Sequence, residues 1–83
     1  MDISVCKEYF TEKVKENYPN EDPRFDGVIQ QVLEKLQKID IRNSEDVAEI
    51  MALKHCLLDN IPAKDYEKAD SMLRKFIISC QKV

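Results

Sequence analysis

His55 is the one histidine in this sequence, and histidine is the residue type that enzymes use most often as a general acid or base. General acid–base catalysis needs such a group to be held in a cleft and tuned toward the working pH. On a helix of about 100° per residue, His55 projects roughly 80–100° from the middle of its apolar stripe, which favours a boundary histidine over a catalytic one. No acidic residue has a histidine three positions later, so the sequence lacks the Glu-x-x-His pairs that di-metal helical bundles use.

The sequence also lacks the residues that would activate a nucleophile or form a phosphate-binding loop. A serine needs a base and oxyanion donors, and a phosphate-binding loop needs several glycines, whereas the chain has only Gly27. Cys6, Cys56 and Cys80 are odd in number and show no C-x-x-C spacing, which indicates reduced thiols in a cytosolic protein. His55 and Cys56 alone do not make a zinc site. We therefore expect no catalytic residue, no metal and no cofactor.

Length and charge narrow the function further. A chain of 83 residues is expected to form a single domain, residues 1–83, with no room for a large cofactor beside its core. The net charge is −3 and no basic cluster is present, so we expect no nucleic-acid partner. No apolar run approaches the ~18–20 residues that span a bilayer, and MDISVCKEYF is unlike a signal peptide. These features predict a soluble, cytoplasmic protein.

Apolar residues recur every three or four positions in four segments, which is the periodicity of helices. The first segment, about residues 2–17, has the narrowest stripe. The second begins at Asp22–Pro23, an N-cap carboxylate followed by a proline. The third begins at Asn43 or Ser44 and is apolar on most sides, which predicts neighbours on more than one side. The fourth begins near Pro62–Ala63. Short connections favour antiparallel neighbours, so the sequence predicts an all-α, antiparallel up-down four-helix bundle.

The predicted core consists of the four stripes. They are Ile3, Cys6, Phe10 and Val14; Phe25, Val28, Ile29, Val32, Leu33, Leu36 and Ile39; Val47, Ile50, Met51, Leu57, Leu58 and Ile61; and Tyr66, Ala69, Leu73, Phe76, Ile77 and Cys80.

Two residues interrupt this pattern. Lys54 lies near the middle of the third stripe, so either its ammonium group extends to solvent or the stripe is partly open and Lys54 meets an acidic partner. Ile78 points roughly 150° away from the fourth stripe, either as an isolated exposed residue or, together with Met72 or another exposed apolar side chain, as part of a docking surface. The candidate partner-binding residues are Lys54, His55, Met72, Lys75, Ile78 and Lys82.

Two stretches carry a resemblance to a known family. They are EDPRFDGVIQQVLEKLQKI, with an acid–proline helix start, and VAEIMALKHCLLDNIPAKDYEKADSMLRKFI, with a tyrosine early in its last helix. Their apolar spacing resembles that of the immunity proteins of pediocin-like bacteriocins. The resemblance implies a small cytosolic four-helix bundle that protects the producing cell, acting at a membrane receptor complex, a sugar permease, from the cytosolic side. It also implies that the C-terminal half selects the bacteriocin.

The sequence thus favours a non-catalytic helical bundle that acts by protein–protein binding, with bacteriocin immunity as its most specific form. The alternative is a helical adaptor or assembly subunit that self-associates, for example as a homodimer, or completes a larger complex. An enzyme or metal-dependent protein is a third hypothesis from a different class.

Overall fold

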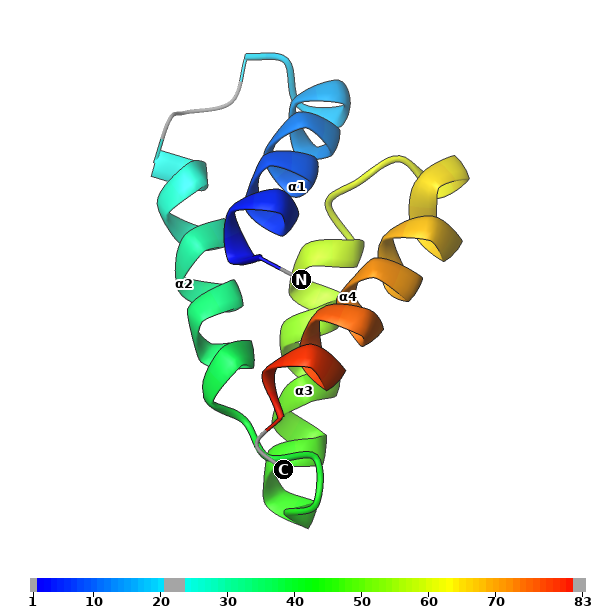
Figure 1. Cartoon of the computed structure of the whole chain (residues 1–83). Helices are drawn as coiled ribbons and strands as arrows, with labels where there is room; N and C mark the ends of the chain where they lie inside the picture. Colours follow the sequence, from blue (N-terminus) through cyan, green and yellow to red (C-terminus); the bar gives the residue numbers. More distant parts are fainter. Residues whose placement is uncertain (1, 21–23, 82–83) are drawn as a thin grey trace.

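The computed structural model describes residues 2–20 and 24–81, and the side chains of all of these except residues 24–26. Within these ranges the chain forms four α-helices and no strand: α1 (Ile3–Asn17), α2 (Arg24–Lys38), α3 (Ser44–Leu58) and α4 (Tyr66–Cys80) (Figure 1). A 3₁₀ turn, η1 (Ala63–Asp65), leads into α4. The predicted all-α class with four helices is confirmed.

Side chains immediately before two of the helices fix where these helices begin. The Asp2 carboxylate accepts a hydrogen bond from the backbone N–H of Ser4, and the Asn43 side chain accepts one from the N–H of Glu45. Both bonds satisfy amides that a helix leaves unpaired at its N-terminus. Of the two predicted caps for α3, Asn43 is the one used. The predicted start of the second helix, Asp22–Pro23, lies outside the described residues.

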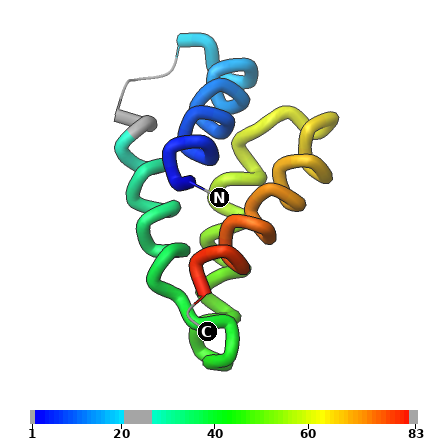
Figure 2. The backbone as a smooth tube through the Cα atoms, in the orientation of Figure 1, coloured from blue at the N-terminus to red at the C-terminus, as the bar shows by residue number. Residues whose placement is uncertain are grey.

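α2 and α4 each pack against the three other helices. α1 packs against α2 and α4, α2 also packs against α3 and α4, and α3 packs against α4. Lys13 Nζ, near the end of α1, lies 3.5 Å from Oδ2 of Asp65, the residue just before α4. Gln81, just after α4, forms hydrogen bonds with the α2–α3 connection. Successive helices run in alternate directions in Figure 1, and the end of α4 meets the α2–α3 connection at one end of the molecule (Figure 2).

The core draws side chains from all four helices. It contains Cys6, Phe10, Val14, Ile29, Val32, Leu33, Leu36, Ile39, Ile50, Leu57, Leu58, Ile61, Ala69, Leu73, Phe76 and Ile77. All of these belong to the predicted stripes, and burying them is the main favourable contribution to folding. Of the predicted set, Phe25 lies outside the described side chains, while Ile3 and Cys80 pack at the edge of the core.

Four residues of the predicted stripes are exposed instead of buried: Val28, Val47, Met51 and Tyr66. α3 has the two neighbours that its composition predicted, α2 and α4. It nevertheless turns only Ile50, Leu57 and Leu58 into the core, and Met51 is 57% exposed. The prediction was wrong for these four residues because an apolar stripe can be wider than the strip of helix that its neighbours cover. Of these residues, Met51 lines a surface hollow together with Tyr66 and other residues of α4.

Candidate protein-binding groove between α3 and α4

Two adjoining hollows lie along the surface between α3 and α4. The isoleucine hollow has a volume of about 200 Å³ and is lined by Ile41, Ile50, Lys54, Arg74, Ile77 and Ile78. The tyrosine hollow has a volume of about 260 Å³ and is lined by Met51, Lys54, His55, Leu58, Tyr66, Asp70 and Arg74. Lys54 and Arg74 line both hollows, so we describe the two together as the α3–α4 groove.

The isoleucine hollow combines a buried floor with exposed walls. Ile50 and Ile77 belong to the core, whereas Ile41 is 44% exposed and Ile78 is 65% exposed. Ile78 lies on the side of α4 that faces away from the core, one position beyond buried Ile77. Ile41 lies in the connection between α2 and α3. A loop residue and a helix residue thus place two large aliphatic side chains on the same surface hollow.

Gln81 holds Ile41 in this position. Its side-chain amide nitrogen donates to the backbone carbonyls of Ile39 and Ile77, at 3.0 and 2.9 Å, and its carbonyl oxygen accepts from the N–H of Ile41 at 3.0 Å. These three bonds tie the α2–α3 connection to the end of α4. The wall of the hollow is therefore fixed by hydrogen bonds from a residue that is itself outside the groove.

A three-residue ionic cluster separates the two hollows. Lys54 Nζ lies 2.7 Å from Asp70 Oδ1, and Arg74 Nε lies 3.0 Å from Asp70 Oδ2. The side chains of Lys54 and Asp70 are 18% and 19% exposed, whereas that of Arg74 is 69% exposed. Because one carboxylate serves two cations, the cluster carries a net positive charge, and Arg74 presents that charge to solvent.

The groove contains three of the predicted partner-binding residues. Lys54 and His55 line the tyrosine hollow, and Ile78 lines the isoleucine hollow. Lys54 meets an acidic group, as one interpretation of its position required, but that group is Asp70 of the same chain.

The other three predicted residues do not line the groove. Met72 packs partly buried against the core, because about 120° of helical rotation separates it from Ile78. Ile41, instead of Met72, is the exposed apolar neighbour of Ile78. Lys75 is exposed and lines neither hollow of the groove, and Lys82 lies outside the described residues.

Sequence reasoning missed Ile41, Asp70 and Arg74. Asp70 and Arg74 are four positions apart on α4, a spacing at which opposite charges pair on a helix, so this signal was present in the sequence. Ile41 stands in a connection and belongs to no periodic stripe. Its place in the groove depends on the bonds from Gln81, which join residues about 40 positions apart and leave no periodic signal in the sequence.

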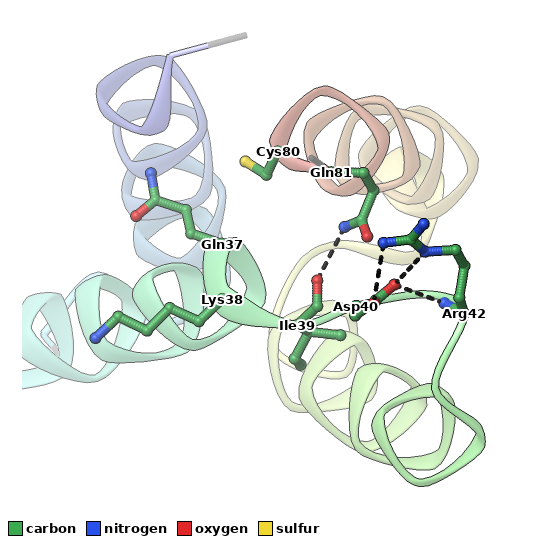
Figure 3. Close-up of a pocket in the computed structure, with 7 residues that line it drawn as sticks. All are labelled: Gln37, Lys38, Ile39, Asp40, Arg42, Cys80 and Gln81. Atoms are coloured by element: carbon green, nitrogen blue, oxygen red, sulfur yellow. Dashed lines mark hydrogen bonds and ion pairs between the residues drawn. The ribbon is translucent and has the colours of Figure 1, made fainter. Parts of the chain in front are cut away.

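A larger hollow, of about 320 Å³, lies where the α2–α3 connection meets the end of α4 (Figure 3). Asp40, Arg42 and Gln81, three of its lining residues, make side-chain hydrogen bonds. Arg42 donates to both carboxylate oxygens of Asp40, at 3.1 and 3.3 Å, and this hydrogen bonding lowers the pKa of Asp40. Figure 3 shows the thiol of Cys80 pointing away from this pair. The contacts here hold two segments together, so we assign this hollow a structural role.

Outside the groove, the thiol of Cys6 is the most deeply buried of the three cysteine thiols. Cys6 is fully buried, and burial raises the pKa of its thiol to about 11, which keeps the thiolate form scarce near neutral pH. Within residues 2–20 and 24–81, no group of three or more His, Cys, Asp or Glu side chains is arranged to hold a metal ion. In the same part of the chain, no helix has the length and hydropathy needed to cross a membrane.

No family model matches the sequence, and neither a curated protein nor a solved structure matches it.

Proposed function

We propose that this protein is a non-catalytic helical bundle that binds another protein through the α3–α4 groove. The observation that carries the proposal is the isoleucine hollow, where Ile41 and Ile78 stand exposed above a buried aliphatic floor. An exposed apolar surface with a charged rim is typical of a protein interaction site. Interfaces gain much of their affinity from a few apolar anchors that fill such hollows.

The most specific form of this proposal is a cytoplasmic immunity protein for a pediocin-like bacteriocin. Support comes from the resemblance carried by residues 21–39 and 47–77, which implies that the C-terminal half selects the bacteriocin. Most of the groove lining, from Ile50 to Ile78, comes from that half of the chain. The groove would then contact the membrane receptor complex, or the bacteriocin bound to it, from the cytosolic side.

Expression of the chain in a bacterium that is sensitive to a panel of pediocin-like bacteriocins tests this function. We expect survival against at least one member of the panel and loss of that protection with Ile78→Asp. Val28→Asp is the matched control, because Val28 is also an exposed aliphatic residue but lies on α2, away from the groove. Both variants should retain the helical circular dichroism spectrum of the parent chain. If the chain protects against no member of the panel, the immunity function is contradicted.

The alternative, self-association, is favoured by a different surface. On the outer side of α3, the small residues Ala48, Ala52 and Cys56 follow one another at four-residue spacing and are all exposed. Small residues four positions apart allow two helices to approach closely, so this face could contact a second copy of the chain. A dimer formed through this face would be disrupted by Ala52→Glu, which sedimentation equilibrium would detect, while Ile78→Asp would leave it intact.

A further inference from the structure

The chemistry of the groove restricts the kind of segment that can occupy it, provided that the groove binds a partner as proposed above. Asp70 uses one oxygen for Lys54 and the other for Arg74, so both of its oxygens are engaged. The ion pair of Arg74 is made through Nε, and its side chain is 69% exposed, so a partner can reach the terminal nitrogens. A guanidinium group with free terminal donors is well suited to a carboxylate.

The apolar anchor residue Ile78 lies one helical turn after Arg74 on α4. Ile78 follows Arg74 by four positions on α4, and residues at this spacing stand about 5–6 Å apart at Cβ. Both side chains line the isoleucine hollow, with Lys54 on its opposite wall. A partner segment therefore meets an aliphatic surface and a positive charge separated by about one turn of helix.

The charge of the groove differs from that of the whole chain, which favours an acidic partner. The whole chain has a net charge of −3, but the ionic cluster in the groove has two cations and one carboxylate. The α3 side of the groove contributes Ile50, Met51, Lys54, His55 and Leu58, none of which is acidic. The ionic cluster thus attracts an acidic segment to the groove, although the chain as a whole has a net negative charge.

We infer that the partner is a protein segment that presents a branched aliphatic side chain and a carboxylate about one helical turn apart. The aliphatic side chain enters the isoleucine hollow between Ile41 and Ile78. The carboxylate accepts hydrogen bonds from the terminal nitrogens of Arg74. An amphipathic helix with leucine and glutamate at positions i and i+4 has this arrangement.

A set of four helical peptides tests this inference on the full chain. Each is a capped, alanine- and glutamine-based peptide that differs only at two positions, i and i+4: leucine with glutamate, leucine with glutamine, leucine with lysine, or alanine with glutamate. Titration into ¹⁵N-labelled protein, followed by amide chemical shifts, gives the site and the affinity. We expect the leucine–glutamate peptide to shift the signals of Ile41 and Ile78 and to bind about two- to fivefold more tightly than the leucine–lysine peptide at low salt.

Variants of the protein test whether Arg74 causes the preference for glutamate over lysine. Arg74→Gln should abolish the preference for glutamate over lysine, because it removes the charge but retains a hydrogen-bond donor. Lys35→Gln is the matched control, since Lys35 is an exposed cation on α2 and its loss changes the net charge equally. Ile78→Ser should weaken all leucine peptides alike. High salt should shrink the glutamate preference more than the leucine contribution.

The outcomes separate the two proposals. If the leucine–lysine or leucine–glutamine peptide shifts the groove signals as strongly as the leucine–glutamate peptide, the acidic preference is wrong while binding at the groove stands. If none of the four peptides shifts the signals of the groove, the inference and the assignment of the groove as the binding surface both fail.

Discussion

At the scale of single residues, Asp70 determines the electrostatics of the groove. Lys54 and Arg74 both pair with this carboxylate, and two of the three side chains are less than one-fifth exposed. An ion pair in this setting is worth more than a fully exposed one, since water screens it less. Removal of the shared partner leaves two like charges close together, whereas removal of either cation leaves the carboxylate still paired.

Asp70→Asn should therefore destabilise the protein by about 1–2 kcal/mol, because it removes the shared partner of two partly exposed ion pairs. Lys54→Met should cost less than half as much, because Arg74 continues to pair with Asp70 and the methionine keeps most of the apolar contact of the lysine stem. Urea unfolding at neutral pH and low salt measures both differences.

Glu67→Gln provides the control for this comparison, because Glu67 is an exposed acid on the same helix and its loss changes the charge equally. It should leave the free energy of unfolding within about 0.5 kcal/mol of the parent value. A larger loss from Lys54→Met than from Asp70→Asn would show that the lysine, not the shared carboxylate, holds the cluster together.

At the scale of the elements, the stripe of α2 forms a continuous part of the core. Ile29, Val32, Leu33 and Leu36 are all buried along it, and α2 packs against α1, α3 and α4. Leu33 is fully buried. Val28 belongs to the same apolar pattern but is 43% exposed. Leu33 and Val28 thus belong to the same apolar stripe of one helix, but only Leu33 is buried.

Leu33→Ala should lower the free energy of unfolding by about 2–4 kcal/mol, because it removes buried methyl groups and leaves a cavity. Val28→Ala should change it by less than about 0.5 kcal/mol, since solvent already reaches the side chain. Denaturant unfolding followed by circular dichroism measures both. Equal losses for the two variants would mean that another surface covers Val28 in solution.

The helices and most of the core could be predicted because a 3.6-residue period and the residues that cap helices are properties of local sequence. Cys6, Phe10 and Val14, for example, are buried on α1 at the spacing the pattern predicts. The exposure of Val47 and Met51 could not be predicted, because it depends on how much of α3 is covered by α2 and α4. The groove was predicted only in part, through Lys54, His55 and Ile78.

At the scale of the whole molecule, the net charge of a segment does not predict which charged side chain it contributes to an ion pair. The net charges of residues 1–23, 24–42, 43–62 and 63–83 alternate from negative to positive along the chain. Two ion pairs that join separate elements, Lys13–Asp65 and Lys54–Asp70, take their cations from α1 and α3, in the negative segments, and their acids from the positive last segment. Individual side-chain positions, not segment charge, therefore determine these pairings.

The core also has consequences for assembly, because the sixteen buried residues of the described part come from all four helices and two connections of one chain. A protein whose core is complete within one chain has a melting temperature that does not depend on its concentration, whereas an obligate assembly melts at higher temperature as concentration rises. We expect the melting temperature to stay constant between about 10 µM and 1 mM, measured by circular dichroism in cells of different path length. If it rises with concentration and Ala52→Glu removes that rise, the exposed face of α3 is a self-association surface and the assembly-subunit function replaces the transient binding proposed for the groove.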